Sequence, residues 1–417
     1  MDLKEQMYLQ NPWWRDTLFL PLESRLPKRT LFSSFFEDVT TTRQAISLTG
    51  LRRVGKSTLL KQIIAKLLSG SVKPKYLLYF SFDQPTVLET TQTLESIMSI
   101  YFDSILGKKI HRLTSSVYVF FDEIQLIPYW QDILKRYYDL TPHIKFVVSG
   151  SASLFVQNRS KESLAGRLFE RYLPPLTFSE YRLLSQNRDM TDFLSFGQFP
   201  EMLALPNLER KMEYLKEGVI GKVLEIDIVK TYGVRKTVDF ERLFWSLLPN
   251  CGQIIASMKL MHDLQLKKAT LFKYLGILEK SLLINKVLNM SGSFRSETRL
   301  LRKLYPGSSN FLSLNVAPVG IGFKAECYVA SILKSRFKNV YLFHHRGREV
   351  DFVVPDKKLA IEVKYQEKIH QSDYWTLEKL VRDKDYLGIV ITKNQEQKPK
   401  GKPIRFIPLE NLDTALP

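Results

Sequence analysis

The sequence has little cysteine and no long hydrophobic run. Only two of its 417 residues are cysteines, Cys251 and Cys327, and their separation matches no metal-binding spacing. This pattern excludes a disulfide framework and is typical of a reducing cytoplasm. No stretch approaches the roughly 18 consecutive apolar residues of a membrane span, and the start, MDLKEQMYLQNPWWRD, lacks the apolar region of a secretion signal. We therefore expect a cytoplasmic protein that does not enter the membrane.

Acidic residues are outnumbered by basic ones. The chain has 61 Lys and Arg against 43 Asp and Glu, a formal charge of +18, and a pI near 9.6. Such a surplus attracts polyanions through counterion release, which makes nucleic acid the expected partner. Loose binding of small anions is the alternative that charge alone leaves open. The hydrophobic content of 44% is ample for real cores, and the length predicts roughly two or three domains of about 150 residues.

Residues 44–149 alternate short apolar runs with amphipathic ones. The apolar runs AISLTG, KYLLYFSF, SVYVFFDEI and IKFVVSGS predict strands, and the segments between them have helical spacing. Continuous apolar strands that alternate with helices indicate a parallel sheet covered on both faces. The fold class is therefore α/β.

One segment of this region has the spacing of a phosphate-binding loop. LTGLRRVGKSTLL follows an apolar strand and opens a helix, and it matches G-x-x-x-x-G-K-[ST]. Backbone N–H groups and the helix N-terminus would face the phosphates of ATP, the lysine would bridge the β- and γ-phosphates, and the serine would bind Mg²⁺. The predicted nucleotide-binding residues of this loop are Gly50, Arg53, Gly55, Lys56, Ser57 and Thr58.

Two further strand ends complete the predicted ATP site. SVYVFFDEI ends in Asp122, which would hold Mg²⁺ through water, and Glu123, which would polarise the attacking water. The alternative for Glu123 is an exposed acid at a strand end. Ser149, at the end of IKFVVSGS, is predicted to sense the γ-phosphate, although turn chemistry accounts for it equally well.

An arginine is needed to neutralise charge in the transition state of ATP hydrolysis. NRSKESLAGRLFERYLPP offers Arg159, Arg167 and Arg171, and Arg167, after a small-residue turn, is the first choice. A solvated helix face is the alternative for each. Arg52 and Arg53 would contact either phosphate or a neighbouring subunit, so a homo-oligomer is compatible with the sequence.

Residues 236–290 predict a basic winged helix. Helix, turn and helix are followed by a strand, SLLINKVLNM, and the second helix exposes Lys267, Lys268 and Lys273. A basic recognition helix suits the major groove of DNA. A small helical lid or adaptor would show the same pattern without touching DNA.

The hairpin EVDFVVPDKKLAIEVKYQ carries charges that a core does not need. With Asp356 and Lys357 as a two-residue loop, Asp351 lies opposite Glu362, at about 4.5–5.5 Å between Cβ atoms. Lys364 is on the same face as Glu362, and Glu326 lies on a helix upstream. Two or three carboxylates could hold Mg²⁺, or alternatively Mn²⁺, while Lys364 stabilises developing charge. A nuclease fold that binds without cleaving is the alternative.

Several of these motifs together resemble a known family. GLRRVGKSTLL, FFDEIQLIPYWQDILKRYYD, VVSGSASL, ESLAGRLFERYLPPLTFSEY and FGQFPEML occur in the order found in a prokaryotic family of AAA-type ATP-binding proteins. The resemblance implies an ATPase joined to a winged helix and a PD-(D/E)xK nuclease-like domain. It extends over about residues 30–410. Glu326, Asp351, Glu362 and Lys364 match the nuclease pattern, and Gln198 departs from the family's GGxPE turn.

The sequence thus predicts a P-loop NTPase domain followed by helical and nuclease-like parts. The expected domains are an N-terminal extension with the ATPase core, a helical lid or linker, a winged helix and the nuclease-like domain, at residues 1–175, 176–235, 236–290 and 291–417. The predicted function is a Mg²⁺-dependent ATPase that acts on DNA with a metal-dependent nuclease-like module. A nucleotide-switched DNA-binding regulator and a protein adaptor, each with an inactive nuclease fold, are the alternatives.

Overall fold

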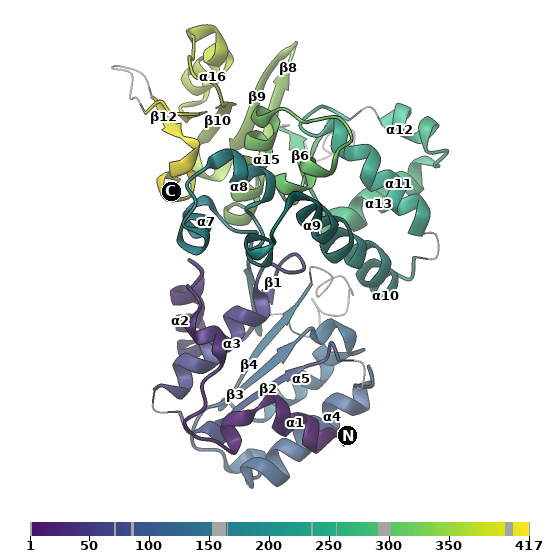
Figure 1. Cartoon of the computed structure of the whole chain (residues 1–417), viewed down its shortest axis with the longest axis vertical. Coiled ribbons are helices and arrows are strands. Elements are labelled where there is room, and N and C mark those ends of the chain that lie inside the picture. Colours follow the sequence, from purple (N-terminus) through teal and green to yellow (C-terminus); the bar gives the residue numbers. More distant parts are fainter. Residues whose placement is uncertain are drawn as a thin grey trace. The chain divides into compact units, whose positions relative to one another are not determined.

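The structure is a computed structural model, in which the chain divides into two compact units (Figure 1). The first comprises Met1–Leu173 with Lys230–Gly233, and the second comprises Pro174–Val229 with Val234–Pro417. Each unit is described by itself. The structure describes residues 2–70, 72–84, 87–151, 164, 166–234, 237–255, 257–290, 302–396 and 403–416.

The first unit is built on a parallel sheet of five strands in the order β2-β3-β4-β1-β5. The strands are β1 (Ala45–Thr49), β2 (Leu77–Ser81), β3 (Val117–Asp122), β4 (Ile144–Gly150) and β5 (Leu168–Tyr172). All six residues of β3 are buried, as expected where helices cover both faces of a parallel sheet. The predicted parallel sheet is confirmed, whereas β5 was not predicted, because RLFERY interrupts its apolar residues with charges.

Helices flank this sheet on two sides. The helices are α2 (Phe32–Thr41), α3 (Lys56–Leu68), α4 (Thr91–Ile100) and α5 (Trp130–Leu140). Figure 1 shows α2 and α3 on one side of the strands and α4 and α5 on the other. Because the strands are parallel, the loops that follow β1, β3 and β4 all emerge at the carboxyl-terminal end of the strands, which is one edge of the sheet in this description. Their side chains can meet there.

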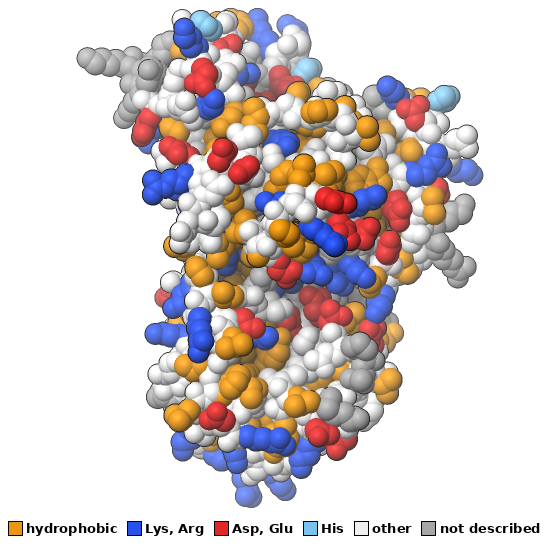
Figure 2. Space-filling model, in the orientation of Figure 1, with side chains coloured by type: hydrophobic (Ala, Val, Ile, Leu, Met, Phe, Trp, Pro, Cys, Tyr) orange, Lys and Arg blue, Asp and Glu red, His pale blue; other side chains and the backbone are white. Residues whose placement is uncertain are grey.

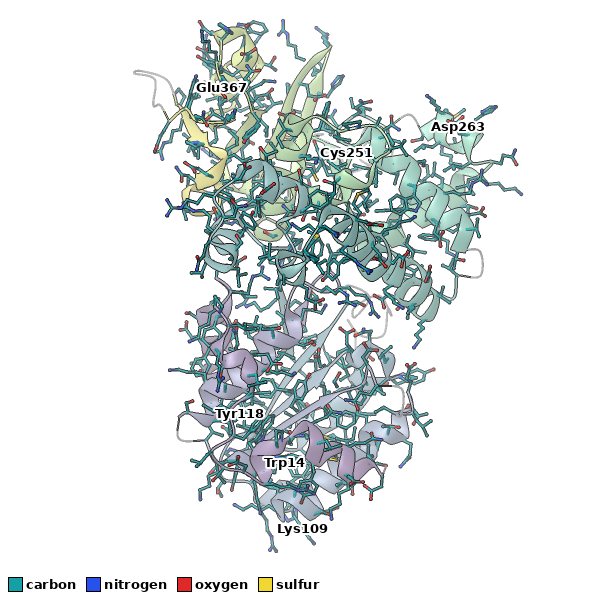
Figure 3. All side chains as sticks on the ribbon, viewed as in Figure 1. Trp14, Lys109, Tyr118, Cys251, Asp263 and Glu367 are labelled. Atoms are coloured by element: carbon teal, nitrogen blue, oxygen red, sulfur yellow. The ribbon has the colours of Figure 1, made fainter. Side chains whose placement is uncertain are left out.

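An N-terminal extension covers the edge strand β2. It consists of α1 (Leu3–Gln10) and a 3₁₀ turn, η1 (Pro12–Trp14), where Trp14 is labelled in Figure 3. The Asn11 side chain accepts from the Tyr79 N–H (2.7 Å) and donates to the Tyr79 carbonyl (2.8 Å). Gln10 accepts from the Ser81 N–H at 2.7 Å, and the Trp14 indole donates to the Leu77 carbonyl at 2.8 Å. Side chains thus take the place of a further strand and block edge-to-edge pairing.

The second unit begins with helices. These are α7 (Phe178–Ser185), α8 (Met190–Phe196), α9 (Leu208–Glu213), α10 (Ile228–Tyr232), α11 (Thr237–Leu247), α12 (Ser257–Asp263) and α13 (Lys268–Lys280), with wider π-helical turns over Tyr214–Gly221 and Val223–Asp227. α10 runs across the point where the chain passes between the units. No helix among the described ranges is both long and apolar enough to cross a membrane.

A seven-stranded mixed sheet forms the rest of the second unit, in the order β12-β11-β10-β9-β8-β6-β7. Its strands are β6 (Ile284–Asn289), β7 (Arg302–Pro306), β8 (Tyr341–His345), β9 (Arg348–Val354), β10 (Leu359–Lys364), β11 (Leu387–Thr392) and β12 (Ile404–Pro408), and its helices are α15 (Ile321–Arg336), α16 (Gln371–Lys384) and α17 (Leu412–Ala415). β6 pairs with both β7 and β8. The last strand of the expected winged-helix segment therefore belongs to the same sheet as the expected nuclease-like domain.

Gln198 ties the helical segment to the strand segment of this unit. It is 1% exposed, and its Oε1 accepts from the Ser308 hydroxyl at 2.5 Å and from the Ser309 N–H at 3.0 Å. Its own N–H donates to Asn310 Oδ1 at 2.8 Å. A glycine would supply none of the side-chain bonds, so glutamine has a packing role at this turn.

Candidate functional site

The predicted phosphate-binding loop connects β1 to α3. Gly55 caps α3 with left-handed dihedrals (φ 96°, ψ 26°), a conformation that glycine adopts without strain. Lys56 is 5% exposed, and its Nζ donates to the carbonyls of Gly50 (3.2 Å) and Leu51 (3.0 Å). The lysine therefore already reaches back over the loop in which a phosphate would lie.

Gly50 is required by close packing at the start of this loop. A Cβ added there would lie 2.5 Å from the Leu173 carbonyl oxygen and 3.1 Å from Val54 Cγ2. Arg29, which is 8% exposed, donates to the Val54 carbonyl at 2.7 Å. The loop is thus held from two sides, which preorganises its backbone N–H groups for an anion.

Asp122 and Ser149 meet at the same sheet edge, as predicted. Asp122 is 2% exposed, its Oδ2 accepts from the Tyr79 hydroxyl at 3.0 Å, and its Oδ1 accepts from the Ser149 hydroxyl. Burial, followed by the charge of Asp122, raises the pKa of Tyr79 well above its usual value. Two donors keep the carboxylate in one orientation, so Asp122 can hold a water on Mg²⁺ without binding the ion directly.

Glu123 directly follows β3 in a left-handed conformation (φ 55°). Non-glycine residues seldom adopt this conformation, and such strain concentrates at functional sites. Its Oε1 lies 4.0 Å from Lys56 Nζ, and its Oε2 accepts from the Gln125 amide at 2.5 Å. Burial raises the pKa of Glu123 above its ordinary value, and Lys56 opposes this effect. A carboxylate with a raised pKa is a better proton acceptor.

A pocket of about 550 Å³ lies beside these groups in the first unit. Ser57, Lys61, Tyr79 and Asp122 line it, together with residues of the N-terminal extension such as Trp13. The hydroxyl and carboxylate oxygens are ligands that Mg²⁺ prefers. The residues of this site therefore fit a Mg²⁺–nucleotide. Thr58 follows Ser57 in the first turn of α3 and is half-buried.

The predicted Arg167 lies away from the phosphate-binding loop of its own chain. The Arg167 carbonyl accepts from the Ala45 N–H at the amino end of β1, whereas the phosphate loop follows the carboxyl end, about 15 Å further along the strand. Arg167 Nε donates to Asp139 at 3.0 Å, and Arg171 makes a bidentate pair with Asp38 at 2.6 and 3.0 Å. Arg167 cannot reach the phosphates of its own chain. Arg159 lies outside the described residues.

The second unit holds the charged hairpin, in the predicted register. Leu359 pairs with Val354, and Ile361 pairs with Phe352, which places Asp351 opposite Glu362. The loop has four residues and not two, because Pro355–Lys357 form a 3₁₀ turn that ends in a left-handed Lys358 (φ 51°). The register survives because the loop gains one residue on each side.

Asp351 and Glu362 are each paired with a lysine. Lys303, on β7, is 4% exposed, and its Nζ lies 3.3 Å from Asp351, 3.2 Å from Glu326 and 2.5 Å from Glu349. Asp351 Oδ2 also accepts from the Val363 N–H at 2.9 Å. Lys364 Nζ lies 2.8 Å from Glu362. Each carboxylate of the predicted metal site therefore has an ammonium partner.

A divalent metal does not fit this cluster as it stands. Mg²⁺ and Ca²⁺ bind carboxylate oxygens at roughly 2.0–2.6 Å, and Lys303 fills the space where Asp351 and Glu326 would share such an ion. Across the described part of the chain, no three His, Cys, Asp or Glu side chains are placed to hold one metal. The prediction of a metal bound by Glu326, Asp351 and Glu362 conflicts with the position of Lys303.

Burial and neighbouring charges shift the pKa values of the cluster's side chains. Burial, followed by the charge of Asp351, raises the pKa of Glu362 to about 8 and that of Glu326 to about 7. Burial lowers the pKa of Lys303, but Asp351, Glu326 and Glu349 together outweigh it, so this pKa is raised. Lys303 thus remains an ammonium at neutral pH and is the charge around which the acids are arranged.

The expected winged-helix segment has three helices and an antiparallel pair of strands. α11, α12 and α13 are followed by β6 and β7, and Ile254, between α11 and α12, bridges Lys303 on β7. Lys267, Lys268 and Lys273 are exposed as expected, while Met258 is 77% exposed. On the face in Figure 2, Lys and Arg are interspersed with Asp and Glu across the surface.

Several functional residues were missed from the sequence. Tyr79 lies in LLYFS and Lys303 in RKLYP, two short strands that mix polar with apolar residues, so neither side chain stands out in the sequence. Tyr305 donates to Glu326 at 2.7 Å, and Glu349 reaches Lys303 from β9. A shift in strand register between β8 and β9, at Tyr341–Phe343, changes the direction of neighbouring side chains. No local sequence pattern predicts this shift in register.

Residues 42–182 match a family described as an AAA domain. The match and the parallel five-stranded sheet fit a P-loop NTPase domain. Residues 187–306 and 321–412 match two domains of unknown function, DUF8612 and DUF4143.

Relatives of similar length are described as uncharacterised proteins. One from Haemophilus influenzae is 23% identical over 365 residues, which cover 83% of this chain and 88% of the relative. One from Methanocaldococcus jannaschii is 27% identical over 301 residues, which cover 63% of this chain and 60% of the relative. A second from the same organism is 25% identical over 382 residues, covering 83% and 81%.

The similarity of this chain to solved structures is low, both in TM-score and in sequence identity. The Aeropyrum pernix ORC1 protein in complex with DNA has a TM-score of 0.32 and 16% identity, over 73% of this chain and 95% of that one. Replication initiator DnaA bound to AMPPCP and single-stranded DNA has a TM-score of 0.30 and 13% identity, over 60% and 86%. At these TM-scores neither likeness carries an argument about this chain.

Proposed function

We propose that this protein is a Mg²⁺-dependent ATPase that acts on DNA. The observation that carries the proposal is the convergence of Lys56, Ser57, Asp122, Glu123 and Ser149 at one edge of the parallel sheet, in a region that matches an AAA domain. Gly50, Arg53, Gly55 and Thr58 complete the loop and the first turn of the helix. ATP and water would give ADP and phosphate.

The residues of the site have separate roles in this proposal. The loop N–H groups and Lys56 would bind the phosphates, and Ser57 would hold Mg²⁺, which would supply positive charge beside them. Asp122, oriented by Tyr79 and Ser149, holds a water of the ion. Glu123 orients the attacking water and accepts its proton, which its raised pKa favours. Ser149, near the end of β4, would sense the γ-phosphate.

The arginine that this reaction requires must come from elsewhere. Arg167 lies at the amino-terminal end of the strands, opposite the phosphate-binding loop. Within one chain it is therefore not a candidate for the arginine that contacts the phosphates. An arginine from a second copy of the chain would meet the requirement, which is the reason to retain a homo-oligomer as part of the proposal. Location in the cytoplasm also remains a prediction from the sequence.

DNA is the proposed partner on which this ATPase acts. The support is the net charge of +18 and the exposed lysines at the start of α13 and within it, Lys267, Lys268 and Lys273. Three helices followed by β6 and β7, with Ile254 bridging β7, are the order of elements in a winged helix. Lysines on α13, the last of these three helices, would contact phosphates in the major groove.

For the C-terminal part, we retain a nuclease-like module as a prediction and favour its inactive form. In the active form, Glu326, Asp351 and Glu362 would hold Mg²⁺ or Mn²⁺ and Lys364 would stabilise the transition state. Lys303 stands against this arrangement, because it occupies the space among the carboxylates. The second candidate function is therefore a nucleotide-switched DNA-binding regulator with an inactive nuclease fold.

The ATP site is tested with Lys56→Ala, using Lys66→Ala as the control. Both lysines belong to α3, but Lys66 is exposed near its C-terminal end. Calorimetry should show that Lys56→Ala loses nucleotide binding, because no second ammonium replaces it in the loop, and that Lys66→Ala keeps it. Asp122→Asn should reduce Mg²⁺-dependent hydrolysis more than binding. Parental ATP affinity in Lys56→Ala would refute the assignment.

A further inference from the structure

Lys303 is the centre of a buried charge cluster and not a surface lysine. Its Nζ is within 3.3 Å of carboxylate oxygens from three residues, Glu326 on α15 and Glu349 and Asp351 on β9. The side chain is 5% exposed. An ammonium is seldom buried to this extent unless it is paired, and here three acids from two elements share it.

The backbone of Lys303 is fixed on both sides. On one side Lys303 pairs with Val287 of β6. On the other side Ile254 bridges Lys303, and the Leu304 carbonyl accepts from the Gly252 N–H at 3.0 Å. Since β7 is held by both neighbours, the ammonium cannot leave the cluster by a movement of an open edge strand.

The carboxylates of the cluster also have partners other than Lys303. The Tyr305 hydroxyl donates to Glu326 at 2.7 Å, the Val363 N–H donates to Asp351 at 2.9 Å, and Lys364 pairs with Glu362 at 2.8 Å. A divalent ion placed between Asp351 and Glu326 would lie within a few ångströms of the ammonium. The repulsion between two such cations in a buried site opposes binding of the ion.

We infer that Lys303 is a built-in cation that takes the place of a divalent metal, so that this nuclease-like cluster binds no Mg²⁺ or Mn²⁺ and does not cleave DNA. The carboxylates are arranged around a positive charge, and the chain supplies that charge itself. Removal of the ammonium at a constant side-chain volume should therefore create a divalent-metal site. This inference concerns the second unit alone and does not depend on the ATPase proposal.

The experiment titrates Mn²⁺ into the full chain carrying Lys56→Ala, in which the ATP site is disabled. Calorimetry and the Tm of this parent are compared with those of Lys303→Met, which has similar length and no charge. Lys286→Met is the matched control, because Lys286 lies on the neighbouring strand and pairs with Glu279 at 2.6 Å, outside the cluster. Adding Asp351→Asn to each protein identifies binding at the cluster.

The parent and Lys286→Met should show no Mn²⁺ binding that depends on Asp351. Lys303→Met should bind Mn²⁺ at least about tenfold more tightly than the parent and gain Tm with added metal, and Asp351→Asn should abolish both effects. Parental Mn²⁺ binding that Asp351→Asn removes would overturn the inference, as would a folded Lys303→Met protein without such binding.

Lys303→Met leaves several carboxylates facing each other, so it is also refolded with and without Mn²⁺. Recovery of the fold only with metal supports the inference. If the variant folds in neither condition, the comparison of the parent with Asp351→Asn decides, because Asp351-dependent Mn²⁺ binding in the parent contradicts a built-in cation and its absence supports one. Nicking of supercoiled plasmid by the parent that Asp351→Asn abolishes would likewise refute it.

Discussion

Asn11 offers a direct test of how the N-terminal extension stabilises the first unit. Its side chain is fully buried and bonds both the N–H and the carbonyl of Tyr79 on the edge strand β2, at 2.7 and 2.8 Å. Asn11→Ala leaves both backbone groups without a partner. A buried, unpaired group costs about 1–3 kcal/mol, so the loss of stability should be about 2–6 kcal/mol.

Gln10→Ala is the matched control for this substitution. Gln10 caps the Ser81 N–H of the same strand at 2.7 Å, but it is only half-buried, so water can replace it. Its loss should cost about 1 kcal/mol or less. The two variants thus compare the same kind of bond to the same strand at different burial.

Hydrogen exchange of the amides in β2 measures this difference locally. A loss of about 2 kcal/mol in local stability speeds exchange roughly 30-fold, because 1.4 kcal/mol corresponds to a factor of ten. We expect at least this change in Asn11→Ala and a change of a few-fold in Gln10→Ala. Equal exchange rates in the two variants, or an unchanged rate in Asn11→Ala, would refute the view that the extension acts as a substitute strand.

Two further predictions concern charge in the second unit. Replacing Lys267, Lys268 and Lys273 with Ala should weaken duplex DNA binding for all sequences and reduce the salt slope by up to about three units. The same change at Lys108 and Lys109, exposed in the first unit, should not alter the slope, and an unchanged slope in the triple variant would place the DNA surface elsewhere. Because the pKa of Glu362 is raised from 4.5 to about 8, the folded chain binds more protons than the unfolded chain between these values. Stability should therefore fall as the pH rises from about 5 to about 8. Glu362→Gln should flatten this part of the pH profile of Tm, and an unchanged profile would contradict the assigned cause.

Much of the ATP site was predictable from short stretches of sequence. A glycine-rich loop between a strand and a helix, and an acid at the end of an apolar strand, each carry their chemistry locally. The parallel arrangement then brings Lys56, Asp122 and Ser149 to one edge, since all strands of such a sheet end on the same side. Tyr79 escaped prediction because its partner, Asp122, is 43 residues away.

Local sequence patterns were sufficient to predict the phosphate-binding loop, the alternation of strands and helices, and the register of the charged hairpin. Each depends on residues that are close in the chain or on the two-residue period of a strand. Long-range packing places Arg167 at the amino-terminal end of the strands and Lys303 among the carboxylates. Lys303 is 23 residues from Glu326 and 48 from Asp351, and no periodicity relates these residues. They meet because β6 and β7 join the C-terminal sheet, a pairing between distant segments that depends on how the whole unit buries its apolar faces.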